Sequence, residues 1–348
     1  MRGKVIFWFD EVGRESSQVV GGKCANLGAM IQMGMRVPPG FAISAEAYQW
    51  FIEDTGVALE ISHYIESLGK IEGIKQLEET SRTIRTIIES KGIPEDLKEK
   101  ISLAYRTLCA KVGIPDVPVA VRSSGLVEDS ASASYAGQFE TFLNVKGEVE
   151  VVDKVKKVWS SSFTTRAIGY RAKRGIPVGA EVLLGVGVLK MVNPRCAGIG
   201  FTIDPVSGST SKIIIEANWG LGEGVVSGAT QVDRYVVDKD TLEIKESTIG
   251  NKETRVVSKE KGTIIEEVAV DKRLISCMAD EEVKEVSRLA KLLEEQLGSP
   301  QDIEWAIDND LLFPQNVVLL QTRPVTAIVK KSATDKILDL MLSRLYRR

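Results

Sequence analysis

Four polar side chains near the end of the chain have the types and spacing expected of a site for a metal ion and phosphate groups. Asp302 and Glu304 stand two residues apart in one apolar run, and Gln321 and Arg323 stand two apart in the next. The turn-rich segment between the runs predicts an antiparallel hairpin, in which residues two apart project to one side. Carboxylate and amide oxygens suit a divalent cation, and an arginine fork suits phosphate. The alternative is a hairpin whose polar face meets water.

A glycine turn opens a predicted helix near the start of the chain. Gly21 and Gly22 precede Lys23, and the pattern to Met30 is helical. Glycines let a backbone approach a ligand closely, amides at a helix start favour an anion, and Lys23 adds a positive charge. The spacing is not that of a GxxxxGK[ST] phosphate loop. The segment is therefore either a phosphate site or only a turn.

A third candidate begins at Arg122, directly after the predicted strand Val117–Val121. Small and hydroxyl residues follow it as far as Gly137 and Gln138. An arginine and backbone amides at the end of a strand are a common place for phosphate to bind. We expect this segment either to close over a nucleotide or to be a surface loop.

Helices and strands must position these groups. Apolar positions at helical spacing predict a helical layer over residues 58–112, an amphipathic helix at 149–174 and a helix with an acidic start at 280–297. Apolar runs predict strands of a second sheet, at residues 182–192, 197–205 and 212–217. A glycine-dense turn around Glu223 follows them.

Composition excludes several classes of protein. The 348 residues carry a net charge of −3. The sequence therefore lacks the excess positive charge that is typical of proteins that bind nucleic acid or an anionic membrane surface. The four cysteines form no CxxC pair, so neither a disulfide framework nor a zinc site is expected, and a reducing cytoplasm fits. The longest apolar stretch contains Lys190 and is too short to span a bilayer. The single histidine, His63, is expected on the surface of a helix.

Several blocks of residues resemble the nucleotide-binding part of phosphoenolpyruvate synthase and pyruvate phosphate dikinase. They occur in matching order from Val5 to Val325, and they are Gly-Gly-Lys-x-Ala-Asn-Leu-Gly at 21–28, Val-Arg-Ser-Ser at 121–124, Tyr-Ala-Gly-Gln-x-Glu-Thr at 135–141, Gly-Phe-Thr-Ile-Asp-Pro at 200–205, Trp-Gly-Leu-Gly-Glu at 219–223, Asp-Ile-Glu-Trp at 302–305 and Leu-Gln-Thr-Arg-Pro at 320–324. The resemblance implies an α+β fold of the ATP-grasp type, with two subdomains that clamp ATP. The subdomains are expected at 1–180 and 181–328, followed by a helical tail at 329–348.

The resemblance also implies a role for each matching residue. Lys23 and Arg122 resemble phosphate contacts, and Arg323 resembles a phosphate-binding arginine. Glu304 and Gln321 resemble ligands of Mg²⁺ and phosphate, and Asp302 is a further candidate ligand. The remaining nucleotide contacts would be the hinge residues Lys190 and Met191, together with Glu223, Gly137 and Gln138.

Enzymes of this group pass phosphate from ATP to a histidine on a swivelling domain and then to a substrate. His63 lies outside any such motif. The resemblance therefore implies that the chain is one subunit of a split enzyme, with the phosphohistidine domain on a separate partner subunit and with release of AMP and phosphate. A chain of this kind resembles most the ATP-binding subunit of phenylphosphate synthase, which makes phenol the expected acceptor.

Two alternatives stay open. One is the ATP-binding subunit of a split phosphoenolpyruvate synthase-like enzyme or of another small-molecule dikinase. The other is a nucleotide-sensing module that transfers no phosphate. The tail at 333–348, whose apolar residues form one stripe, is expected either to dock the partner or to pack on its own domain.

Overall fold

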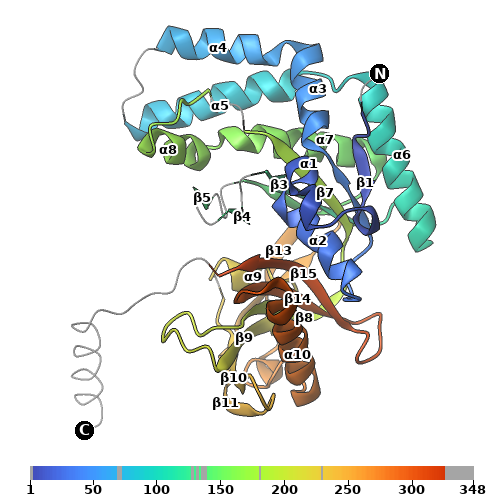
Figure 1. Ribbon diagram of the computed structural model, residues 1–348, viewed down its shortest axis with the longest axis vertical. Helices are drawn as coiled ribbons and strands as arrows, with labels where there is room; N and C mark the ends of the chain where they lie inside the picture. Colours follow the sequence, from blue (N-terminus) through green and yellow to red (C-terminus); the bar gives the residue numbers. More distant parts are fainter. Residues whose placement is uncertain are drawn as a thin grey trace. The chain divides into compact units, whose positions relative to one another are not determined.

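The computed structural model describes residues 3–68, 73–126, 129–130, 133–134, 139–179, 182–228 and 230–325. The chain divides into two compact units of helices and antiparallel sheet (Figure 1). The first unit is Met1–Val192 together with Val257–Ile264, and the second takes up the chain at Asn193. The expected mixture of helix and sheet is confirmed, whereas the predicted tail at 329–348 lies outside the described residues.

The sheet of the first unit has the strand order β1-β2-β7-β3-β6, and all its neighbours are antiparallel. Its strands are β1 (Ile6–Trp8), β2 (Gly40–Ile43), β7 (Leu184–Lys190), β3 (Val119–Gly125) and β6 (Thr141–Val145). The short strands β4 (Asp129–Ser130) and β5 (Ala133–Ser134) pair with each other. Leu189 of β7 lies opposite Gly40 on one side and Ala120 on the other.

This topology corrects two expectations. The apolar run at 182–192 belongs to the first sheet and not to a second one, and the unit boundary falls after Val192 rather than after residue 180. β7 is buried along most of its length and needs a partner at each edge, which β2 and β3 supply. An apolar run predicts such a buried strand but does not identify its neighbours.

Helices pack on this sheet or on the helices that cover it. They are α1 (Ser17–Val20), α2 (Gly22–Gln32), α3 (Ala45–Thr55), α4 (Val57–Leu68), α5 (Ile74–Ser90), α6 (Glu95–Val112), α7 (Glu148–Ser160) and α8 (Thr165–Lys173), with short 3₁₀ turns η1 (Phe9–Glu11), η2 (Arg14–Ser16) and η3 (Ser161–Phe163). The core centres on Trp159 of α7, which is fully buried and stacks on Phe51 of α3 at 5.3 Å between ring centroids. His63 is exposed on α4, as expected.

The single helix expected at 149–174 is wrong, because the chain breaks at η3. The hydroxyls of Ser161 and Ser162 donate back to the carbonyl oxygens of Val158 and Trp159, at 2.6 and 2.8 Å. Such bonds compete with the helix ladder. The hydroxyl of Thr164 then accepts from the amide of Ala167 and starts α8.

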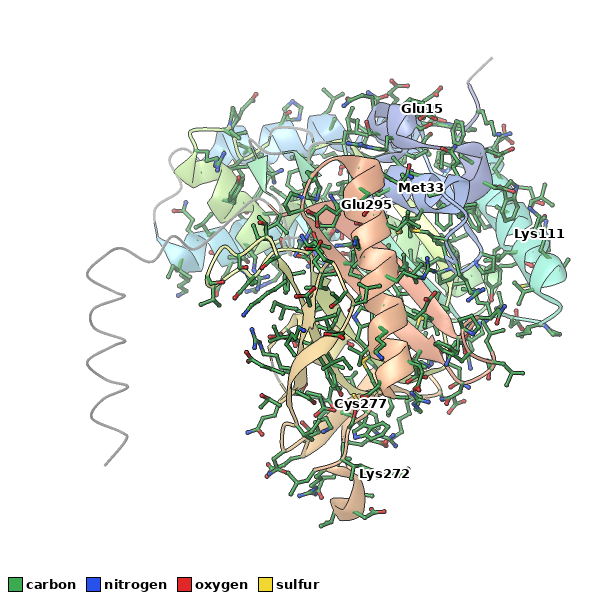
Figure 2. All side chains as sticks on the ribbon, turned by 60° about the horizontal axis from the view of Figure 1, so that its bottom comes forward. Glu15, Met33, Lys111, Lys272, Cys277 and Glu295 are labelled. Carbon is green, nitrogen blue, oxygen red and sulfur yellow. The ribbon has the colours of Figure 1, made fainter. Side chains whose placement is uncertain are left out.

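The second unit is built on a sheet with the order β11-β10-β9-β8-β14-β15. Its strands are β8 (Pro194–Phe201), β9 (Lys212–Trp219), β10 (Asp233–Asp238), β11 (Ile244–Thr248), β14 (Gln301–Asp308) and β15 (Val317–Pro324). The other elements are α9 (Glu223–Val226), η4 (Val270–Lys272) and α10 (Asp280–Leu297). A ribbon of β12 (Thr254–Ser258) and β13 (Thr263–Glu267) begins and ends in this unit, while its middle part, Val257–Ile264, belongs to the first unit. α10, predicted at these bounds, lies along the strands of the sheet and packs against β8, β9 and β14 (Figure 2).

Candidate functional site

The hairpin predicted near the end of the chain is confirmed, and its register is the one that a site requires. Glu304 lies directly opposite Gln321, and Asp302 lies directly opposite Arg323. Directly paired residues of antiparallel strands share a face, with their Cβ atoms about 4.5–5.5 Å apart. The four side chains therefore occupy one patch, while Ile303 and Trp305, on either side of Glu304 along the strand, are fully buried.

A β-bulge between Glu304 and Trp305 sets this register. Gln321 pairs with Glu304 while Leu319 pairs with Trp305, so Leu320 is the extra residue of β15. The connecting loop closes where the amide of Asp308 donates to the carbonyl of Asn316 at 2.8 Å. The loop between the strands thus leaves the facing pairs intact.

Asp302 and Arg323 form an ion pair within the patch. Arg323 Nε and Nη2 lie 2.9 and 2.7 Å from the same oxygen, Asp302 Oδ2. Burial raises the pKa of Asp302, and the attraction of Arg323 only partly opposes this effect. The Asp302 side chain is 13% exposed and that of Arg323 is 35% exposed, so the guanidinium is held in place but still reaches solvent.

Glu304 and Gln321 are the other pair of the patch. Gln321 is 6% exposed and Glu304 is half-buried. One carboxylate and one amide oxygen on adjacent strands fit Mg²⁺, which usually takes one or two protein carboxylates and completes its shell with water and phosphate oxygens. Within the described ranges no group of three or more His, Cys, Asp or Glu side chains forms a cage for a metal. The pair of Glu304 and Gln321 fits an ion whose other ligands are phosphate and water oxygens.

The first unit carries the other candidates, beginning with Lys23 in the first turn of α2. Gly21 precedes this turn with φ of +80°, and a Cβ atom there would lie 1.9 Å from the carbonyl oxygen of Ser124. The amide of Cys24 donates to Ser124 Oγ at 3.0 Å. Glycine at position 21 thus lets the helix start dock on the end of β3.

Arg122 lies two residues before that contact, in the middle of the sheet. It is opposite Gly187 of β7 and Thr141 of β6. A Cβ atom at Gly187 would lie 3.0 Å from Cys24 Sγ and 3.4 Å from Arg122 Cγ. The bare backbone of β7 therefore leaves room for both the arginine and the helix that carries Lys23.

Neither Ser124 nor Gly187 was among the residues singled out from the sequence. Both act by bringing backbone segments together. A signal was present in Gly185-Val186-Gly187, because glycine inside a strand often marks a close approach of another backbone. A Cβ atom at Gly185 would lie 2.4 Å from the carbonyl oxygen of Val20.

The remaining candidates are more scattered. Lys190 is the last residue of β7 and Met191 follows it; their amides donate to the carbonyls of Pro39 and Pro118 at 2.9 and 2.8 Å. These two N–H groups are thus used within the first unit, so recognition of a base would fall to other groups of the segment. Glu223 is exposed at the start of α9 in the second unit. Gly137 and Gln138 lie outside the described residues.

Each unit thus carries residue types that suit a nucleotide-binding protein. The first has Arg122 within its sheet and Lys23 in the first turn of a helix, and the second has a carboxylate, an amide and an arginine on one hairpin. A comparison with models of protein families matches residues 17–343 to the AMP/ATP-binding domain of pyruvate phosphate dikinase. The chain belongs to this family of ATP-binding domains.

Curated relatives agree with this assignment. The chain is 42% identical to a probable phosphoenolpyruvate synthase of Staphylothermus marinus over 356 residues, which cover 96% of this chain and 42% of the relative. It is 41% identical to the phosphoenolpyruvate synthase of Aeropyrum pernix over 356 residues, 95% of this chain and 43% of the relative. The phosphoenolpyruvate synthase of Pyrococcus furiosus is 38% identical over 377 residues, 97% of this chain and 45% of the relative. The chain therefore spans less than half the length of these relatives.

These relatives bear on the expected substrate. They support a dikinase-like, ATP-dependent role, and they fit the phosphoenolpyruvate synthase-like alternative better than the expected phenylphosphate synthase. The preference for phenol as acceptor is accordingly not supported. In the part of the chain that the structure describes, no helix is long and apolar enough to cross a membrane.

Proposed function

We propose that this chain binds ATP with Mg²⁺ and carries out the first half of a dikinase reaction, in which ATP and water yield AMP, one phosphoryl group on a histidine, and inorganic phosphate from the remaining phosphoryl group. The single observation that carries the proposal is the register of β14 and β15, which puts Glu304 opposite Gln321 and Asp302 opposite Arg323. The family match supports ATP as the nucleotide. We further propose an ATP-grasp mode of binding, in which residues of both units act on one ATP molecule.

The chemistry asked of the chain is positioning and charge stabilisation. In phosphoryl transfer, charge spreads over the oxygens of the transferred group, and cations in fixed positions stabilise it. Lys23, Arg122 and Arg323 would supply these cations. Glu304 and Gln321 would hold Mg²⁺, which neutralises phosphate charge when it is bound. Asp302 would keep the Arg323 fork oriented.

The acceptor histidine is proposed to lie on a phosphohistidine domain, carried by a partner subunit. His63 is exposed on α4, and the described contacts give it no connection with either half of the site. The names of the relatives favour pyruvate over phenol as the final acceptor. A nucleotide sensor that transfers no phosphate is the competing outcome of the test below.

The test uses ATP labelled in the β-phosphate. The chain is mixed with the part of the Aeropyrum pernix enzyme that lies beyond the matched region. We expect acid-labile label on that partner, in step with AMP formation. Tight ATP binding with no label on the partner would instead favour the sensor.

Two substitutions test the assigned residues. Glu304→Gln keeps the shape of the side chain but removes its charge, and Arg122→Ala removes a cation; each should lower transfer by about 100-fold or more. Lys245→Ala is a suitable control, because Lys245 forms an ion pair with Glu243 at the surface, at 2.7 Å. Near-normal transfer by both site variants would show that the site is placed wrongly.

A further inference from the structure

The second unit has a pocket that the proposed ATP chemistry does not use. Its volume is about 490 Å³, within the usual range for small-molecule sites. It is lined by Pro194, Arg195, Trp219, Arg255, Val268, Ala269, Lys272 and Asn309. Cations, apolar groups and one indole thus line it, and no acid is among the lining residues.

The pocket lies at the far end of β14 from the candidate metal ligands. Asn309 follows the last residue of β14, whereas Glu304 lies in the first half of the strand and Asp302 near its start. Five residues of strand span about 17 Å. A phosphate bound at Glu304 and Gln321 is therefore well separated from this pocket.

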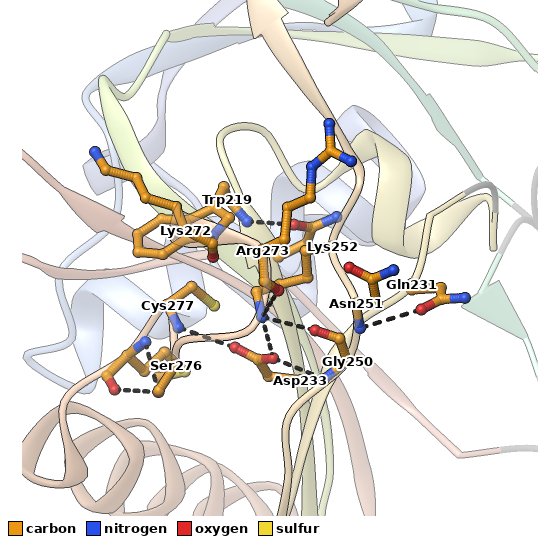
Figure 3. Close-up of polar contacts among 12 residues, drawn as sticks. Trp219, Gln231, Asp233, Gly250, Asn251, Lys252, Lys272, Arg273, Ser276 and Cys277 are labelled. Atoms are coloured by element: carbon orange, nitrogen blue, oxygen red, sulfur yellow. Dashed lines mark hydrogen bonds and ion pairs between the residues drawn. The ribbon is translucent and has the colours of Figure 1, made fainter. Parts of the chain in front are cut away.

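A buried ion pair fixes the wall that carries Lys272. Lys252 Nζ lies 2.5 Å from Asp233 Oδ1 and also donates to the carbonyl of Arg273 at 3.1 Å (Figure 3). The carbonyl of Lys272 in turn accepts from Trp219 Nε1 at 3.2 Å. The indole and the backbone of Lys272 are thus held together, so this side of the pocket is preformed.

The charge of the pocket is positive. Arg195 pairs with Glu282, and Arg255 pairs with Glu266 at 2.6 Å. A guanidinium has five N–H donors, so pairing with one carboxylate leaves donors for a ligand. Lys272 is exposed, and within the described ranges its ammonium has no acidic partner. A phosphate group satisfies such a set of donors better than a neutral group does.

The other lining residues favour a ligand with a flat ring. Trp219 offers an indole, and Pro194 and Val268 are apolar. Aromatic side chains stack on planar groups and bury a large apolar area. A phosphate joined to a ring would use both kinds of wall.

We propose that this pocket is a second ligand site, for a small phosphorylated molecule with a planar ring, separate from the site that holds the phosphates of ATP. The inference goes beyond the proposed phosphoryl transfer and does not depend on it. Arg195, Arg255 and Lys272 bind the phosphate, and the ring packs on Trp219.

Calorimetry on the whole chain tests this site. With one equivalent of a non-hydrolysable ATP analogue, which fills the ATP site and leaves no excess to occupy the pocket, we titrate AMP, inorganic phosphate and adenosine in separate experiments. AMP should bind most tightly, phosphate should bind more weakly and adenosine should bind least. Absence of AMP binding, or adenosine binding as tightly as AMP, overturns the proposal.

Variants locate the binding. Lys272→Glu reverses an exposed charge and should weaken AMP binding by about tenfold or more, while Lys245→Glu at the surface of the same unit should change it less than about twofold. Trp219→Phe should remove the ligand-induced change in tryptophan fluorescence and keep most of the affinity. If Lys272→Glu weakens binding of the ATP analogue as strongly as binding of AMP, the pocket belongs to the ATP site and the proposal fails.

Discussion

The two halves of the candidate site are held in place by different physical means. In the first unit, close packing of backbone segments holds the residues in place. Gly21 packs against Ser124 and Gly185 packs against Val20 at distances that exclude a side chain. In the second unit, the strand register places Glu304 opposite Gln321, and a side-chain ion pair between Asp302 and Arg323 holds the guanidinium. The first half should therefore respond to added volume, and the second to changes of charge and pH.

The largest effect on stability should come from a charge pair outside both halves. Lys252 and Asp233 are fully buried, and Lys252 also donates to two carbonyl oxygens. Lys252→Met leaves Asp233 buried without its cation, which should cost about 3–5 kcal/mol of unfolding free energy. Urea denaturation measures this loss.

Arg323→Met is the matched change in the second half of the site. Because this pair still reaches solvent, the loss should be about 1 kcal/mol. Phosphoryl transfer, in contrast, should be abolished by Arg323→Met and retained by folded Lys252→Met. Equal destabilisation by the two variants would remove the distinction between a pair that supports the fold and a pair that serves a ligand.

A loss of stability between those of Lys252→Met and Arg323→Met is expected when one methyl group is added in the first half of the site. Gly21→Ala adds a Cβ 1.9 Å from Ser124 O at a residue with φ of +80°. Overpacking and backbone strain together should cost about 2–4 kcal/mol, and displacement of α2 should lower ATP affinity. Gly34→Ala is the control, because φ is +75° there but nothing lies within 4 Å of the added Cβ.

The control separates strain from steric overlap. Gly34→Ala should cost about 1 kcal/mol from strain alone, with ATP affinity unchanged. Gly21→Ala behaving like Gly34→Ala would mean that close packing on Ser124 does not position Lys23.

The same contrast explains what could be predicted from the sequence. The hairpin is local, and alternation within each strand fixed which side chains share a face, so the facing of Glu304 and Gln321 was predictable once the register was known. The bulge at Leu320 that sets this register leaves no pattern of its own in the sequence. α10 was predictable to its ends because its acidic start and Gly298, with φ of +71°, mark them.

The parts that could not be predicted depend on contacts between distant segments. The hydroxyl of Ser124 accepts a hydrogen bond from the amide of Cys24, which lies 100 residues earlier in the chain. Strand β7 pairs with β2 and β3, which lie far from it in the sequence. The break after α7 also went unpredicted, because serine hydroxyls that bond back to the helix carbonyls override the apolar periodicity. Periodicity identifies elements but not their partners.

The smallest expected effect is a pH dependence confined to the second half. Burial raises the pKa of Asp302 above its usual value of 3.8, so the folded protein holds this proton to a higher pH than the unfolded chain does. The contribution of Asp302 to stability is therefore lost as pH rises from about 3.8 through the raised pKa, and is constant above it. Asp302→Asn should remove this slope.

Asp204 gives a control of opposite sign. Burial alone would raise its pKa, but hydrogen bonds from Ser207 and Val206 outweigh burial and lower it. The contribution of Asp204 to stability is present above the usual carboxyl pKa and is lost as pH falls, so Asp204→Asn should be most harmful near neutral pH.

Carboxyl NMR titration of Asp302 and Asp204, with and without Arg323→Met, measures the pKa shifts directly. Because Arg323 opposes the effect of burial, its removal should raise the pKa of Asp302 further and leave that of Asp204 in place. An unchanged pKa of Asp302 in Arg323→Met would show that the ion pair does not influence the pKa of this carboxyl group.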